Sequence, residues 1–259
     1  MARLLLQCFV ICSINMQTAQ VNTPQNMSAP EDPEIEALFE SGAHIGYGKE
    51  RRHPKMLEYI FGTRNNVEVF DLSKTLEKLK AAEEFLKTLG SEGKALLWVG
   101  TKPPARQHIK EIGEKLGLPY VFKRWLGGTL TNFKIFEGRL NYWNKLEIEE
   151  KSGEFEKYSK KEKLMKAIEL RKLARMFGGL RSLKSMPAAV IIVDTGEEKT
   201  ALAEAERKNI PVIALMNVDL NPEGIAYPVP LNDNSSAVIA LALGRLAAAY
   251  EAGLKTRQI

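Results

Sequence analysis

Cysteine is almost absent from this chain of 259 residues, and this scarcity limits the chemistry that the protein can support. The two cysteines, Cys8 and Cys12, lie four residues apart near the N-terminus, with no other metal-ligating side chain close to them. No metal site is therefore expected. The rest of the chain cannot form a disulfide framework, which agrees with a reducing compartment.

Catalytic groupings are also missing. Asp194 and Asp219 follow predicted strands, where α/β enzymes often place acids, but no base–nucleophile pair accompanies them. Asp194 is expected to cap a helix, and His108 to lie on the surface of another. We therefore expect no catalytic residue, no cofactor and no small-molecule substrate.

The N-terminal residues contain no apolar run long enough to cross a bilayer. Residues 4–14 are mostly apolar, but a span takes about 20 residues. The run resembles the core of a secretory signal without a clear cleavage pattern, and the single arginine, Arg3, argues against organellar targeting. Met27 would be a natural translation start for a cytosolic protein. We therefore predict that residues 1–26 are an upstream translation extension or disordered. No membrane is expected as a partner, although cleavage of a signal peptide stays open as an alternative.

Aspartate is absent from residues 123–184, where sixteen Lys or Arg stand against eight Glu, a net charge of +8. The whole chain carries +5, so the remaining residues sum to −3. Positive charge concentrated in one segment is typical of a lobe that contacts phosphate.

Three compact apolar runs predict buried strands, and two weaker runs are further candidates. The strong runs lack polar alternation, which indicates a parallel sheet covered on both faces. The last candidate contains two prolines and suits an edge strand. The runs are residues 95–99, 189–193 and 212–216, with 120–122 and 227–230 as the weaker pair.

Helical patterns separate these strands. Ser73 is expected to cap a helix that ends at Gly90, and Pro103 opens another that ends at Gly117. A third starts at Asp194 or Thr195, and the last at Ser235 or Ser236. Strands that alternate with helices predict a doubly wound α/β domain.

Two polar segments with thin apolar stripes interrupt this alternation between Asn132 and Phe177. Apolar spacings of three and four residues predict an antiparallel helical hairpin that projects from the sheet domain. The predicted organisation is a leader (1–34), a sheet domain (35–122 and 185–252), an inserted basic hairpin (123–184) and a tail (253–259).

The most informative segment, called here the signature segment, is residues 123–134, Lys-Arg-Trp-Leu-Gly-Gly-Thr-Leu-Thr-Asn-Phe-Lys. Arg124 can form a forked pair with phosphate, Trp125 can stack on an unpaired base, and the two glycines let backbone N–H groups approach a ligand. Alternatively, Trp125, Leu130 and Phe133 form a core plug under a loop. The expected nucleic-acid contacts are Lys123, Arg124, Trp125, Gly127, Gly128, Thr131, Asn132 and Lys134.

A second basic cluster comprises Lys49, Arg51, Arg52 and Lys55. Pro54 and nearby glycines favour an exposed loop that presents these cations to phosphate, although a charge run is often only a solvated surface.

Two further contacts are expected close by in the sequence. Arg64 adjoins the turn Asn65-Asn66 between two short β-like runs, and is a candidate phosphate ligand. His44 sits among glycines and is expected either to bond RNA or to stabilise its loop.

A nucleotide site after the first strong strand is a competing interpretation. Gly100, Thr101 and Lys102 lie where α/β folds bind anions, but no glycine fingerprint or phosphate loop is complete. Pro103 and Pro104 also remove two N–H donors there.

Three blocks of the chain resemble, in order, the bacterial-type ribosomal protein S-two family. The signature segment carries Arg-Trp-Leu-Gly-Gly and Leu-Thr-Asn-Phe, and residues 38–46 read Leu-Phe-Glu-Ser-Gly-Ala-His-Ile-Gly. A third block runs from Pro187 to Val212, so the resemblance spans about residues 35 to 250. At Tyr47 many members have a second histidine.

This resemblance implies a fold and a function. The implied fold is a flavodoxin-like or Rossmann-like parallel sheet, with helices on both faces and an inserted α-helical coiled-coil hairpin. The implied protein is a structural constituent of the small ribosomal subunit that binds its ribosomal RNA, supports translation and helps to recruit the S-one protein. It is expected to be cytoplasmic and ribosome-associated. A flavin- or nucleotide-using enzyme and a free helical adaptor are the rivals.

Overall fold

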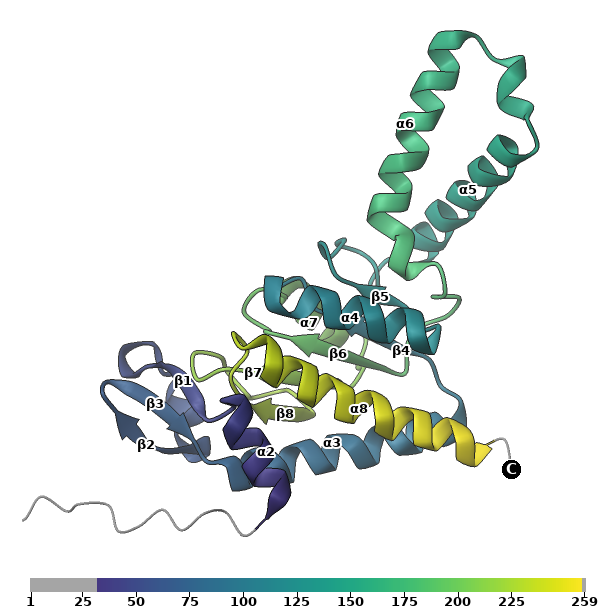
Figure 1. The fold of residues 1–259 in the computed structure, drawn as a ribbon. Helices are drawn as coiled ribbons and strands as arrows, with labels where there is room; N and C mark the ends of the chain where they lie inside the picture. The colour runs from purple at the N-terminus through teal and green to yellow at the C-terminus, as the bar shows by residue number, and fades with distance from the viewer. Residues whose placement is uncertain (1–31, 258–259) are drawn as a thin grey trace, which may run out of the picture.

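The computed structural model describes residues 32–257, and its centre is a five-stranded parallel sheet with the order β5-β4-β6-β7-β8 (Figure 1). All five predicted strands are present. Prolines 228 and 230 are tolerated because β8 lies at an edge of the sheet. The strands are β4 (Leu96–Val99), β5 (Tyr120–Val121), β6 (Ala189–Val193), β7 (Val212–Met216) and β8 (Tyr227–Pro230).

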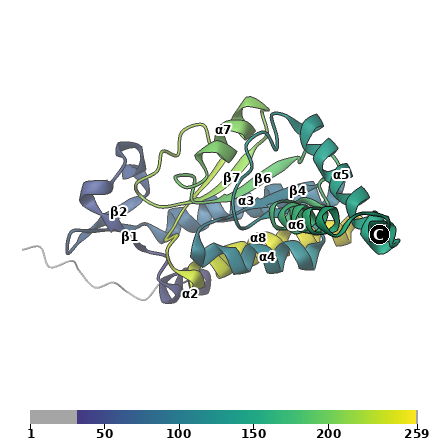
Figure 2. The same cartoon turned by 90° about the horizontal axis from the view of Figure 1, so that it is seen from above.

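Helices cover both faces of this sheet, as a doubly wound fold requires. Alternate residues of β4 point to opposite sides: Leu96 and Trp98 join one apolar cluster, and Leu97 and Val99 join the other. Figure 2 shows α7 on one side of the strands and α4 with α8 on the other. The helices are α2 (Pro33–Ser41), α3 (Leu72–Glu92), α4 (Pro103–Leu116), α7 (Lys199–Arg207) and α8 (Ser236–Arg257).

Two predicted helix ends are wrong by a few residues. The cap of α3 is Asp71, whose carboxylate accepts a hydrogen bond of 3.1 Å from the Ser73 N–H, and the helix continues past Gly90 to end before Gly93 at φ 66°. Gly90 lacks a side chain for another reason, because a Cβ there would collide with the backbone carbonyl of Tyr250 in α8.

The third predicted helix also begins later than expected. Asp194 lies at φ 64° and its carboxylate accepts from the N–H groups of Gly196 and Glu197 at 2.9 and 3.3 Å, so it holds a turn ahead of α7 and does not cap the helix. The start of α8 and both ends of α4 agree with the predictions.

Helix α8 is long and apolar enough to cross a membrane by length and composition, with a mean hydropathy of 1.5 over its best window. In the fold it packs against α3, and Val238, Ala242, Leu246 and Tyr250 are buried. Its apolar character is that of a core helix. Helix α8 continues through Arg257, so it includes residues 253–257 of the predicted tail, and α2 includes residues 33 and 34 of the predicted leader. The predictions about residues 1–26 lie outside the described part of the chain.

A small antiparallel sheet, with the order β1-β3-β2, precedes the main sheet. Asn65 and Asn66, at φ 50° and 64°, form the two-residue turn between β2 and β3, since asparagine tolerates the left-handed region. This sheet consists of β1 (Ile45–Gly48), β2 (Ile60–Arg64) and β3 (Val67–Phe70), with two short 3-10 helices, η1 (Lys49–Arg51) and η2 (Pro54–Tyr59), between β1 and β2.

The polar interruption forms two helices that run antiparallel and extend away from the sheet (Figure 1). Helix α5 (Phe133–Lys151) leads through η3 (Glu154–Lys157) to α6 (Lys160–Phe177), which ends in η4 (Gly178–Leu180). Ser159 and Glu162 form a capping box that starts α6. The domain boundaries inferred from the sequence stay a prediction.

Candidate nucleic-acid interface

The signature segment is held in place by one carboxylate from a distant part of the chain. Glu204 of α7 accepts five hydrogen bonds: from the Trp125 indole at 3.0 Å, from the backbone N–H groups of Gly128, Leu130 and Thr131 at 2.8, 3.0 and 3.1 Å, and from the Thr131 hydroxyl at 3.1 Å. Each carboxylate oxygen therefore has at least two donors. The loop between β5 and α5 is ordered around this single charge.

The environment of Glu204 keeps it ionised. Its side chain is only 5% exposed, and burial alone would raise its pKa. The hydrogen bonds from Trp125 and from the three backbone N–H groups outweigh that effect and lower the pKa of Glu204 below its ordinary value. A buried anion that is satisfied in this way is a rigid support for the loop.

The expected stacking of Trp125 on a base is corrected. Its side chain is 8% exposed, joins the apolar cluster that also contains Leu130, and donates its only N–H to Glu204. The core interpretation is therefore right for Trp125 and Leu130, and Phe133 packs half-buried against the same cluster.

Two other expected contacts of the segment, Thr131 and Gly128, are used inside the protein. Thr131 donates its hydroxyl and its N–H to Glu204, so neither reaches a ligand. Gly128 adopts φ 90° and gives its N–H to the same carboxylate. Gly127, by contrast, is exposed, with open space where a Cβ would stand.

The cations of the segment face solvent. Lys123, Arg124 and Lys134 are exposed and make no ion pair among residues 32–257, and Asn132 is exposed beside them. The Lys123 ammonium lies 5.1 Å from the ring centre of Phe122. These side chains are the part of the segment that remains available to a phosphate.

The second basic cluster is largely neutralised by carboxylates. Arg51 pairs with Asp219 at 3.2 Å and lies over the Tyr47 ring, and Lys55 pairs with Glu223. Arg51 and Lys55 are nevertheless exposed, so their contact with RNA stays a prediction in which a phosphate would have to replace these carboxylates.

Arg52 makes the most buried ion pair of this cluster. Its guanidinium pairs at 3.0 Å with Glu68, which is fully buried and also accepts from the Thr63 hydroxyl at 2.8 Å. Releasing Arg52 to a phosphate would leave a buried charge without its partner. Lys49 and Arg64, in contrast, are exposed and make no ion pair within the described residues.

His44 has a structural environment. Its ring stacks on Phe39 with 4.4 Å between centroids, and burial lowers the pKa of His44, which favours the neutral imidazole. It therefore supplies no positive charge for a phosphate near neutral pH. Of its two expected roles, the structure favours stabilisation of the loop.

The place where a nucleotide phosphate would bind is filled by the protein's own charges. The Lys102 ammonium lies 3.0 Å from Asp194 and 2.9 Å from Asp233, at the carboxyl ends of β4, β6 and β8. Burial would lower the pKa of Lys102, but hydrogen bonds and attraction from the two carboxylates raise it. A phosphate here would face two carboxylates, so the nucleotide alternative is rejected. No group of three metal-ligating side chains occurs in the part of the chain that the structure describes.

Comparison with known proteins decides the family. A family model described as Ribosomal protein S2 matches residues 38–253. The chain belongs to the ribosomal protein S2 family. The small ribosomal subunit protein uS2 of Dictyoglomus thermophilum is 42% identical over 224 residues, which cover 86% of this chain and 91% of that protein. The protein of the same name from Mycobacteroides abscessus is 41% identical over 223 residues, 86% of this chain and 80% of that protein.

Membership of the S2 family confirms the resemblance, the α/β fold and the expectation that the chain is not an enzyme, since the family consists of structural ribosomal proteins.

Two residues of this S2-family chain were missed by the sequence interpretation. Glu204 lies between Ala201 and Ala205 on the buried side of α7, and an acid on an apolar helix face was the available signal. Phe61 is 75% exposed because it is the extra residue of a β-bulge, where Ile60 pairs with Phe70 but Gly62 pairs with Val69. The sequence carries no comparable signal for that bulge.

Proposed function

We propose that this chain is a structural component of the small ribosomal subunit that binds small-subunit ribosomal RNA through the exposed cations of the signature segment and the helical hairpin. One observation supports the proposal most: Glu204 rigidly holds a loop whose exposed side chains include Lys123, Arg124 and Lys134. A preordered loop loses little entropy when it binds, and fixed cations suit a folded polyanion.

The contacts in this proposal are with phosphates. The aromatic ring of the segment is buried, so base stacking by Trp125 is not part of the mechanism. Lys49 and Arg64, on the small sheet, are further proposed phosphate contacts, as is the exposed amide of Asn132. Recognition of this kind reads shape and charge and not base sequence.

A matched pair of double variants tests the RNA contact. Arg124→Ala with Lys134→Ala removes two exposed cations from the interface, whereas Lys115→Ala with Lys255→Ala removes two that pair with Glu251 on α4 and α8. Each phosphate contact contributes roughly 0.7–0.9 to the logarithmic salt slope, so the first variant should flatten the slope by about 1.5. Binding to purified small-subunit RNA, measured across a salt series, should be unchanged in the second variant. Equal slopes in both variants would remove the basis of the proposal.

We also propose that the S-one protein, the partner that the resemblance implies, docks on the small sheet. Phe61 of β2 and Leu57 of the preceding η2 are 75% and 57% accessible, and exposed apolar side chains suit a protein better than RNA. Phe61→Ser should weaken capture of purified S-one protein while RNA binding persists. Retention of full S-one binding by this variant would rule out the site. We propose that the contacts with ribosomal RNA and with the S-one protein both form on the ribosome in the cytoplasm.

A further inference from the structure

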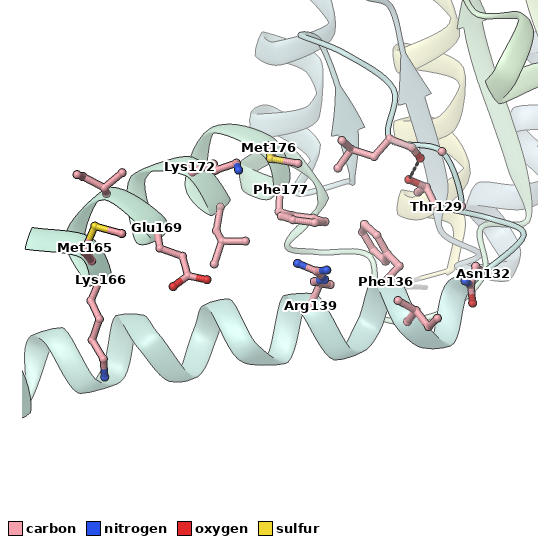
Figure 3. A pocket seen from close by; sticks show the side chains of 16 residues that line it. Thr129, Asn132, Phe136, Arg139, Met165, Lys166, Glu169, Lys172, Met176 and Phe177 are labelled. Atoms are coloured by element: carbon pink, nitrogen blue, oxygen red, sulfur yellow. Dashed lines mark hydrogen bonds between the residues drawn. The ribbon is translucent and has the colours of Figure 1, made fainter. Parts of the chain in front are cut away.

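A groove runs between the two helices of the hairpin, next to the signature segment. It has a volume of about 690 Å³, and Figure 3 shows side chains of α5 and α6 that point into it from both sides. Phe136 and Phe177 close its inner end, with ring centroids 5.5 Å apart. Farther out, the Tyr142 hydroxyl donates to Glu169 at 3.3 Å across the helices.

Apolar side chains are unusually exposed along this groove. Ile135, Met165, Ile168 and Met176 all line it, and they are 62, 61, 51 and 40% accessible. Single exposed apolar residues are common on protein surfaces, but four that line one hollow, with Glu169 and Lys172 among them, give it an amphipathic lining. Three of them lie on α6 within about three turns, a length of roughly 16 Å.

The charged side chains of the groove are predominantly positive. Arg139 and Lys172 line it and make no ion pair among residues 32–257, whereas Lys166 pairs with Glu149 at 3.3 Å. Glu169 is the one acidic side chain in the lining. A ligand that fills the groove should therefore combine apolar groups with negative charge.

We propose that this groove binds an acidic amphipathic helix of about three turns from a partner protein. A protein ligand is favoured over RNA because Ile135, Met165 and Ile168 expose apolar surface in the groove that phosphates and sugars would leave unburied, and Phe136 and Phe177 are too buried to stack on bases. Flexible methionine side chains and aliphatic groups beside cations are typical of grooves that accept an amphipathic helix. This inference goes beyond the proposed RNA contact and does not depend on it: it assigns Arg139 and Lys172 to the protein partner and leaves the other cations of the hairpin to RNA.

A designed peptide tests the groove directly on the purified full chain. The probe is a peptide of about 14 residues with leucine at helical i, i+3, i+4 and i+7 spacing and glutamate elsewhere. Fluorescence anisotropy should show binding, which Met165→Ser with Ile168→Ser weakens at least about tenfold. Both side chains are exposed, so their loss should leave the fold intact.

Two controls separate the possible outcomes. Ile148→Ser removes an equally exposed residue, 67% accessible, that does not line the groove, and should leave peptide binding unchanged. A peptide of the same composition with its leucines dispersed around the helix should bind weakly. The proposal is overturned if the first peptide does not bind, or binds the double variant as well as the original. It is also overturned if the double variant loses affinity for an oligouridylate and not for the peptide, because the occupant would then be RNA.

Discussion

The carboxylate of Glu204 joins a helix on one face of the sheet to a loop more than seventy residues earlier in the chain. Its five donors include three backbone N–H groups that would otherwise need water or another partner. The consequence is a loop whose shape depends on the ionisation of one side chain.

Glu204→Gln should therefore lower the free energy of unfolding by about 2–3 kcal/mol, because an amide cannot accept at both positions and hydrogen bonds to a charge are strong. Urea denaturation at neutral pH measures this change. Glu206→Gln, an exposed position on the same helix, should have little effect. Similar losses from both variants would contradict the role of Glu204.

The same side chain gives the stability a pH dependence. Since folding lowers the pKa of Glu204, its contribution is complete above the unfolded value of about 4.3 and is lost as the pH falls through the folded value. The difference in stability between the original chain and Glu204→Gln should thus shrink in acid. Denaturation curves between neutral pH and acidic pH should show this convergence, and a constant difference would count against it.

The helix pair α3 and α8 crosses at two glycines, and this crossing makes the core of one sheet face. A Cβ at Gly90 would meet the carbonyl of Tyr250 and lie 3.1 Å from the Cα of Gly253, which is backbone and cannot rotate away. Glycine is normally unfavourable inside a helix, so its presence here reflects the close approach.

Gly90→Ala should therefore destabilise the protein by about 2 kcal/mol through overpacking, despite the better helix propensity of alanine. Gly244→Ala in α8, where a Cβ would meet nothing within 4 Å, should instead stabilise it by about 0.5–1 kcal/mol. Thermal unfolding should show a lower melting temperature for Gly90→Ala and a higher one for Gly244→Ala. Stabilisation by both substitutions would mean that the crossing is looser than described.

Over the whole molecule, an internal ion cluster joins the small sheet to the main sheet. Lys102 contacts Asp194 and Asp233, and its ammonium lies 3.3 Å from the hydroxyl of Tyr47 in β1. The cluster lies at the carboxyl ends of the parallel strands, where related folds bind ligands.

Lys102→Met should cost about 3–5 kcal/mol because it leaves buried carboxylates without their partner. Adding Asp233→Asn should recover part of that loss, since one of the unpaired charges is then removed. Urea denaturation of the single and double variants measures the coupling. If the second substitution makes the protein still less stable, charge pairing between Lys102 and the two carboxylates does not stabilise the cluster.

Local patterns predicted most of the secondary structure and the separation of charge. The strands 189–193 and 212–216 and the helix from Pro103 to Gly117 were correct because apolar runs, prolines and glycines act over a few residues. Positive charge in residues 123–184 was likewise evident from composition. The helix starts predicted at Ser73 and Asp194 were misplaced because the carboxylate of Asp71 caps α3, and that of Asp194 closes a turn ahead of α7.

By itself, the sequence determined the order of the elements, the family blocks and the basic character of the hairpin, all of which depend on neighbouring residues. Only the tertiary structure decided which polar and aromatic groups remain available. Trp125 meets Glu204 across 79 positions, and Arg51 meets Asp219 across 168, so both partnerships depend on how the sheet brings distant segments together. A side chain's type states what it can bind, but its neighbours in the folded protein determine whether that capacity is already used.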